Sequence, residues 1–205
     1  MICIIMGVSG SGKSVYSQLI ILSTLGAFLS EKLGWPLHDG DSYHPQENIE
    51  KMSRGEALTD QDRLPWLLKL HEVIQRARTS GSDALVVCSA LKRLYRQILL
   101  HGSKALTASS GPDPEILPPL PDVLCLFLHG DYDLIHQRML ARRGHYMKAD
   151  LLRSQFDALE PPLEDENVLV LDVRRSIADM ATEVEQRIIS RTLSPAVTEL
   201  QQQLK

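Results

Sequence analysis

The chain has 205 residues, 43% of them apolar and 23% charged, which predicts one globular domain with a substantial core. Its formal net charge of −4 argues against nucleic-acid binding, which usually needs a basic surplus, but does not exclude a small anionic substrate. No apolar run is long enough to cross a membrane, and the apolar start lacks the preceding charges of a secretory signal. We therefore expect a cytoplasmic enzyme without nucleic-acid or membrane partners.

Short apolar runs alternate with segments of helical spacing along the chain. The runs are typical of strands buried on both faces and lie at residues 1–6, 84–90, 123–130 and 168–173, with a fifth short strand within 35–41. The segments predicted as helices are 63–79, 91–100, 131–142, 150–159 and 175–191. This alternation predicts a three-layer α/β/α fold around a five-stranded parallel sheet.

Two segments differ from this pattern. Residues 101–122 are rich in Pro, Ser and Gly, which predicts a flexible surface loop. Residues 192–205 are polar and predicted to fray. We expect a single domain over residues 1–191.

The cysteines and tryptophans carry no predicted chemistry. Cys3, Cys88 and Cys125 are widely spaced in apolar runs, which favours buried, reduced thiols over disulfides or a zinc site. Trp35 and Trp66 are interpreted as core packing.

A phosphate-binding loop follows the first predicted strand. The sequence matches G-x-x-x-x-G-K-[ST] over Gly7, Val8, Ser9, Gly10, Ser11, Gly12, Lys13 and Ser14. Glycines let successive backbone N–H groups turn towards an anion, and the following helix adds its positive end. The pattern assigns Lys13 to the outer phosphates of ATP and the Ser14 hydroxyl to Mg²⁺. The alternative, a chance glycine turn, does not explain the full pattern between a strand and a helix.

Acidic residues follow the second predicted strand. No acid ends the run at 84–90, so Asp39 and Asp41 are the nearest candidates for the metal and for proton transfer. The carboxyl ends of parallel strands share one edge, so Asp41 is expected near the phosphate loop. The structural alternative is an Asx turn around Gly40, and Asp39 could equally support its neighbour indirectly.

Several motifs beyond the phosphate loop resemble the gluconokinase family of small P-loop kinases. They are D-G-D-x-x-H-P at 39–45, the block N-x-x-K-M-x-x-G-x-x-L-x-D-x-D-R-x-P-W-L, C-S-A-L-K-x-x-Y-R at 88–96, R-x-G-H and Q-F-x-x-L-E-x-P. The resemblance covers most of the chain. It implies transfer of the ATP γ-phosphate to the 6-hydroxyl of D-gluconate, a helical lid at about 138–160, and a homodimer as one state that such kinases adopt.

The predicted substrate residues suit a hydroxylated carboxylate. Arg or Lys can bind the carboxylate, and mixed donors and acceptors can bind the hydroxyls. Candidates within the motifs, besides Asp41, are His44, Arg63, Lys92 and Arg96. Each has a structural alternative; Arg63, for example, could simply begin a core-facing helix.

Two arginines in the predicted lid are assigned to the nucleotide. Arg138 and Arg142 lie four residues apart, hence on one helix face. In this kinase class such arginines neutralise the transferring phosphoryl group while the lid excludes water, and Arg142 is the catalytic candidate. The alternative is a solvated basic helix end.

Residues 15–23 depart from the family pattern. Their removal leaves GKSTLGAFLSEKLGW, which restores that pattern without a gap. In a continuous helix they would rotate the following turn by roughly 180° and lengthen the helix by about 13 Å. We expect instead a bulge, an early break or an added element, which lets the apolar stripe of Leu25, Phe28, Leu29 and Leu33 keep its register. We hypothesise that the insertion reduces activity and stability.

Three functions remain open from the sequence. The first is a gluconate kinase that uses ATP and Mg²⁺. The second is a related small-molecule kinase, and the third is an impaired variant or a nucleotide-binding protein without turnover, which the insertion suggests.

Overall fold

The computed structural model describes the backbone of residues 1–8, 20–110, 115–140 and 149–203, and the side chains of 1–8, 22–110, 115–138 and 152–192. Five parallel strands form one sheet in the order β2-β3-β1-β4-β5. The strands are β1 (Ile2–Gly7), β2 (Leu37–Asp39), β3 (Ala84–Val87), β4 (Val123–His129) and β5 (Val168–Asp172). This confirms the predicted α/β fold.

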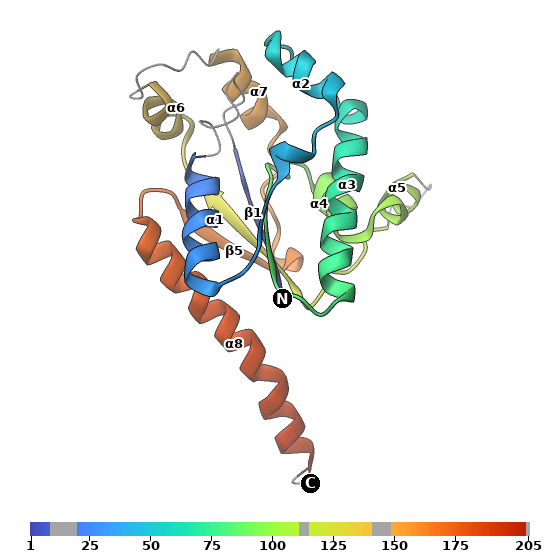
Figure 1. The fold of residues 1–205 in the computed structure, drawn as a ribbon, viewed down its shortest axis with the longest axis vertical. Coiled ribbons are helices and arrows are strands. Elements are labelled where there is room, and N and C mark those ends of the chain that lie inside the picture. The colour runs from blue at the N-terminus through green and yellow to red at the C-terminus, as the bar shows by residue number, and fades with distance from the viewer. Residues whose placement is uncertain (9–19, 111–114, 141–148, 204–205) are drawn as a thin grey trace.

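Helices cover both faces of the sheet (Figure 1). On one face lie α1 (Ile20–Leu33) and α8 (Ile177–Gln203), and on the other α3 (Asp60–Thr79), α4 (Arg93–His101) and α5 (Ser103–Ser109). At the carboxyl ends of the strands lie the short helices η1 (Gly40–Tyr43), α2 (Gln46–Ser53), α6 (Tyr132–Leu140) and α7 (Ala149–Ala158), while η2 (Glu164–Glu166) precedes β5. Two separate apolar cores result, one on each face.

Helix α1 keeps its apolar side against the sheet despite the insertion before it. Leu22, Leu25 and Leu29 are buried, and Leu33 packs against the same core. The stripe therefore keeps its register, as predicted. Phe28 is an exception: it is 37% exposed, so its predicted place in the buried stripe is wrong.

Three predicted boundaries are corrected by the structure. The run at 84–90 is a strand only as far as Val87, because the chain then turns through Ala90, which has a φ of 43°. The predicted loop at 101–122 contains α5, and its later part is fastened by hydrogen bonds between the Gln97 amide and the Leu117 backbone. The helix predicted at 175–191 is longer, since α8 continues to Gln203 and extends past the body of the protein (Figure 1).

The predicted roles of the thiols and indoles are largely confirmed. All three cysteines are free and buried, and burial raises the pKa of Cys3 and Cys125 to about 12. Trp66 is buried in the core, and Trp35 packs at the edge of the opposite core. Trp66 also has a role at the candidate site, which its apolar context does not reveal.

Candidate active site

The carboxyl edge of the sheet brings the start of the phosphate loop to the turn after β3. The Gly7 N–H donates to the Ser89 carbonyl over 3.2 Å. Gly7 has a φ of 149°, and a Cβ there would lie 2.7 Å from the Leu128 oxygen, so only glycine fits without a shift. Gly7 and Val8 thus lie where β1 ends. The other predicted nucleotide residues, Ser9, Gly10, Ser11, Gly12, Lys13 and Ser14, lie outside the described residues.

Asp41 lies at the same edge, on the turn that follows β2. Two hydrogen bonds hold this turn. The Asp39 carboxylate accepts from the Asp41 N–H at 3.0 Å, and the Trp66 indole donates to the Gly40 carbonyl at 2.7 Å. Gly40 is pressed against β3, since a Cβ there would be 2.5 Å from the Val87 oxygen. The Asx turn that the sequence left open is therefore present, but on Asp39, whose carboxylate supports the turn that carries Asp41.

The electrostatic environment of Asp41 differs from that of an ordinary surface carboxylate. Its side chain reaches solvent, yet the protein atoms around the carboxyl group and, secondarily, the charge of Asp39 raise its pKa to about 6. Two carboxylates so close together supply the hard oxygen ligands that Mg²⁺ prefers. Among the described residues no group of three or more His, Cys, Asp or Glu side chains could hold a metal by itself. The donor set therefore fits a magnesium ion that shares its ligands with water and substrate phosphates.

His44 is held as a neutral ring beside this turn. It stacks on Trp66 with 4.4 Å between ring centroids and a 12° interplanar angle. Burial, assisted by the charge of Arg63, lowers its pKa to about 4. Its Nδ1 lies 3.3 Å from the Asn48 amide nitrogen, which can only donate, so Nδ1 accepts and Nε2 carries the proton. His44 can thus donate a hydrogen bond without carrying charge.

Arg63 and Lys92, from the starts of α3 and α4, both lie close to one aromatic ring. The Arg63 guanidinium carbon is 5.8 Å and the Lys92 Nζ 5.6 Å from the Tyr95 ring centroid. Lys92 Nζ also contacts both Asp60 carboxylate oxygens, at 2.9 and 2.7 Å. Arg63 donates to the Leu58 carbonyl. The structure therefore brings together Asp41, His44, Arg63 and Lys92, which we call the acceptor edge.

Arg96 does not join the acceptor edge. It is 2% exposed, and its Nε and Nη2 contact the Glu166 carboxylate at 2.6 and 2.9 Å. Its Nη1 donates to the backbone oxygens of Ala90, Leu91 and Glu160. These contacts contradict the prediction that Arg96 binds substrate, because the guanidinium is buried and each of its three nitrogens already donates to an acceptor within the protein.

The contacts of Arg96 indicate a structural role instead. By binding the Ala90 and Leu91 carbonyls, it secures the turn with positive φ that leads directly to Lys92. The segment after α7 is fastened to the same turn, because the Glu160 N–H donates to the Leu91 carbonyl at 2.9 Å and its carboxylate accepts from the Arg93 N–H at 2.6 Å. We call Leu91, Arg93, Arg96, Glu160 and Glu166 the α4 clamp.

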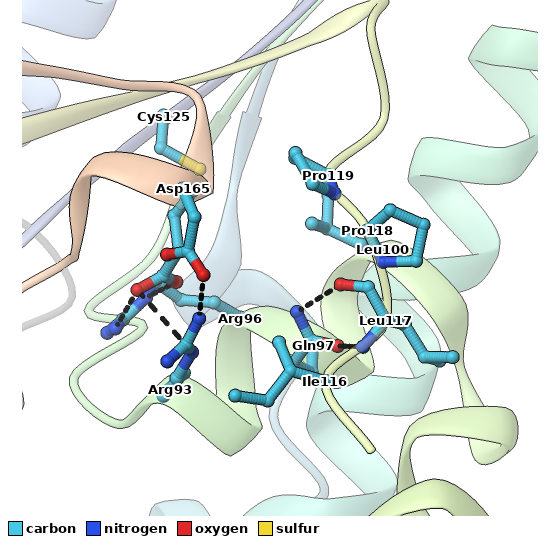
Figure 2. Close-up of a pocket in the computed structure, with 11 residues that line it drawn as sticks. Arg93, Arg96, Gln97, Leu100, Ile116, Leu117, Pro118, Pro119, Cys125 and Asp165 are labelled. Carbon is cyan, nitrogen blue, oxygen red and sulfur yellow. Dashed lines mark hydrogen bonds and ion pairs between the residues drawn. The ribbon is translucent and has the colours of Figure 1, made fainter.

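Figure 2 shows a small cavity beside this clamp. It has a volume of about 130 Å³ and is lined by Arg93, Arg96, Gln97, Leu100, Ile116, Leu117, Pro118, Pro119, Cys125, Asp165 and Glu166. Its cations are paired with acids, Arg93 with Asp165 at 2.5 Å and Arg96 with Glu166. Cys125 belongs to the first half of β4, so this cavity lies away from the carboxyl edge.

Of the two predicted lid arginines, only Arg138 belongs to the described residues. It lies in the last turn of α6, and its Nη1 donates to the Val173 carbonyl, just after β5, at 2.7 Å. Arg142 lies outside the described residues. The described parts of the predicted lid are α6 and α7, which stand at the carboxyl edge (Figure 1).

Sequence reasoning passed over three residues that organise the acceptor edge. Asp60 and Tyr95 contact Lys92, and Trp66 supports both Gly40 and His44. All three belong to the quoted motifs, so a signal was present. Their roles depend on contacts between distant segments, which the motifs do not reveal.

Comparison with known proteins gives a consistent result. No family model matches the chain. It is 44% identical to a probable gluconokinase from Xenopus tropicalis over 90% of this chain and 92% of that protein. It is 40% identical to the thermosensitive gluconokinase of Escherichia coli over 91% of this chain and 87% of that protein. None of the described helices is long and apolar enough to cross a membrane.

Comparison with solved structures also finds a gluconokinase. The structure matches the crystal structure of a gluconokinase from Sinorhizobium meliloti with a TM-score of 0.66 and 36% identity, over 88% of this chain and 87% of that one. A more distant match, at 17% identity and a TM-score of 0.53, is an APS kinase from Mycobacterium tuberculosis, and it supports the fold alone.

Proposed function

Because the chain belongs to the gluconokinase family, we propose that it transfers the γ-phosphate of ATP to the 6-hydroxyl of D-gluconate, which gives 6-phospho-D-gluconate and ADP. The observation that carries this proposal is the acceptor edge, which combines one carboxylate, one neutral imidazole and two cations. Such a set suits gluconate, because cations bind its carboxylate while the carboxylate and imidazole side chains bind hydroxyls.

Each residue of the acceptor edge has a proposed part in the reaction. Asp41 accepts the proton of the attacking 6-hydroxyl, a role that its raised pKa suits near neutral pH. His44 donates from Nε2 to a hydroxyl of the polyol chain. Lys92 and Arg63 bind the carboxylate at the other end of the substrate. Together they would hold the hydroxyl in line with the phosphoryl group.

The nucleotide contacts are proposed from the sequence motif and the lid. Residues 7–14 would hold the phosphates, with Lys13 at the outer ones, while Arg138 and Arg142 would neutralise charge from the lid side. Ser14 and Asp41 would hold Mg²⁺ directly or through water. The ion, when bound, supplies charge neutralisation at the β- and γ-phosphate oxygens.

The insertion favours a second candidate, a chain that binds nucleotide but transfers phosphate poorly. Residues 15–23 follow Ser14 directly, and removing them restores the family spacing between the phosphate loop and the α1 stripe. Helix α1 nevertheless packs Leu25 and Leu29 normally, so the insertion leaves this side of the core intact. The consequence of the insertion is thus expected at the phosphates rather than in the fold.

The test is a coupled assay for gluconate phosphorylation on the full chain beside a variant that lacks residues 15–23. Similar turnover in both supports a working kinase with a tolerated insertion. Turnover only in the shortened variant supports the impaired form. If neither phosphorylates gluconate but another small polyol is phosphorylated, the chain is a related small-molecule kinase. The single domain over 1–191, the cytoplasmic location and the homodimer remain proposals alongside this one.

A further inference from the structure

The Asp60 carboxylate lies where a bound carboxylate would be expected. It contacts Lys92 Nζ through both oxygens and accepts a hydrogen bond from the Tyr95 hydroxyl at 2.5 Å. The charge of Arg63 acts on it as well. Two cations and a hydroxyl donor around one carboxylate form the kind of site that a protein builds for a carboxylate ligand.

The side chains of Lys92 and Asp60 differ in how exposed they are. The Lys92 side chain is 29% exposed and lies over the buried Tyr95 ring, whereas the Asp60 side chain is 56% exposed. Moving Asp60 away from Lys92 would therefore return a solvated carboxylate to water at small cost, because exposed ion pairs contribute little. Lys92 can exchange one carboxylate for another without leaving its place.

We propose that Asp60 occupies the carboxylate subsite of the free enzyme and that the carboxylate of the substrate displaces it from Lys92. This inference rests on the proposed function and adds to it a specificity-determining residue. Asp60 competes with any anion that approaches Lys92, and it does so as part of the same chain, hence at a high effective concentration.

Competition with Asp60 favours ligands that make further contacts besides the one to Lys92. A simple anion gains only the contacts of the subsite itself, so Asp60 excludes it. Gluconate gains further hydrogen bonds from its hydroxyls at Asp41 and His44, which offset the loss of the internal pair. Asp60 would thereby keep small anions out of the site while an extended aldonate still binds.

The experiment compares the full chain with Asp60→Asn at saturating ATP and constant ionic strength. It measures KM for gluconate and the inhibition constant of acetate, a carboxylate without hydroxyls, together with the Kd of gluconate by calorimetry. We expect Asp60→Asn to lower the KM and Kd for gluconate and the inhibition constant of acetate by about two- to five-fold each. This is the range that removal of an exposed ion pair allows. Inhibition by sorbitol, the neutral analogue, and KM for ATP should not change, because neither ligand carries a carboxylate that competes with Asp60.

Two controls distinguish the subsite from general effects. Glu56→Gln removes an equal charge from another exposed ion pair, that with Arg54 at 2.7 Å, and should leave all values unchanged. Lys92→Met should abolish competition by acetate. The α3 capping box is formed by Thr59 and Asp62 and stays intact in Asp60→Asn, so thermal unfolding of this variant should be cooperative.

The outcomes separate this inference from the proposed function. If Asp60→Asn raises KM and Kd for gluconate, or leaves them and the acetate constant unchanged, Asp60 does not compete and the inference is wrong. If the wild-type chain binds gluconate without phosphorylating it, the transfer reaction fails while Kd still tests Asp60. Absence of gluconate binding to the wild-type chain overturns both.

Discussion

The acceptor edge and the α4 clamp meet at the start of α4 and use the same kinds of side chain for opposite purposes. Lys92 and Arg96 are four residues apart in one motif, and each pairs with a carboxylate. Arg96 is 2% exposed and all three of its guanidinium nitrogens donate within the protein, whereas Lys92 is 29% exposed and pairs with a solvated partner. Burial and the number of partners therefore decide which cation holds the fold and which one is left for a ligand.

The two regions also differ in what their loss should affect. Within the α4 clamp, Arg96 and Glu166 are removed from water, so breaking this pair leaves an uncompensated buried ion. In the acceptor edge, charges remain close to solvent, so a substitution changes ligand contacts and costs the fold little. The predictions below test this division, from the largest expected effect to the smallest.

The largest effect is expected from Asp41→Asn in the acceptor edge. An amide cannot accept the hydroxyl proton, so kcat for gluconate phosphorylation should fall by about 10²- to 10⁴-fold. The unfolding temperature should not fall below that of the wild type, because the raised pKa of Asp41 shows that its ionised carboxylate does not stabilise the fold. Steady-state kinetics and thermal unfolding check both parts, and a variant that retains more than a tenth of the wild-type kcat would exclude Asp41 as the base.

In the α4 clamp, Arg96→Met should reduce the free energy of unfolding by about 3–5 kcal/mol, because Glu166 is left buried without its partner. Urea denaturation measures the loss. The double variant Arg96→Met with Glu166→Gln should recover part of it, since the buried charge is then absent. A loss below about 1 kcal/mol would place Arg96 among the ordinary surface ion pairs and remove the contrast with Lys92.

In contrast to Arg96→Met, Lys92→Met should weaken substrate binding and cost the fold little. We expect KM for gluconate to rise by about 10- to 100-fold, the loss of one charged hydrogen-bonding group. KM for ATP should stay constant, because Lys92 lies at the acceptor side. Calorimetry and kinetics on the same preparation check this split, and an equal rise in both KM values would show that Lys92 acts on the whole site.

The pH dependence should identify Asp41 as the titrating group. Its pKa is raised to about 6, so its carboxyl is protonated as the pH falls through that value, and kcat/KM for gluconate should decrease about tenfold per unit below pH 6. His44, with a pKa of about 4, stays neutral over this range. The decrease should therefore persist in His44→Gln. Its disappearance in that variant would assign the titration to His44.

The same shift has a consequence for stability. The pKa of Asp41 is higher in the folded chain than its ordinary value of 3.8, so the folded state binds the proton more tightly than the unfolded one. Asp41 thus destabilises the fold as pH rises from about 4 to 6. Asp41→Asn should remove this contribution, which urea denaturation at pH 4.5 and 7 can measure.

The smallest effect is expected from Trp66→Phe, which keeps a ring under His44 but removes the hydrogen bond to Gly40. We expect a loss of about 0.5–1.5 kcal/mol in stability. A decrease of kcat by a few-fold should accompany it, since the turn that carries Asp41 loses one support. Unchanged kcat would show that Asp39 alone holds the turn.

Local patterns predicted the fold because they reflect burial that does not depend on distant partners. The apolar runs became the strands, and the stripe of Leu25 and Leu29 packed as expected, since a residue in a buried strand or helix face is apolar whatever its neighbours are. The motifs also predicted Asp41, His44, Arg63, Lys92 and Arg96 as substrate residues; Arg96 is buried in the α4 clamp, and the role of the other four remains a prediction.

Features that depend on pairing between distant segments were decided only by the tertiary structure. The sequence could not show that Arg96 meets Glu166 and Glu160, so it assigned this arginine to the substrate. Nor could it show that Asp60 lies against Lys92, because the residues are 32 positions apart. A charged side chain has the same identity whether it is buried or solvated. Its role is therefore set by the partners that folding brings to it, and those partners are not local in sequence.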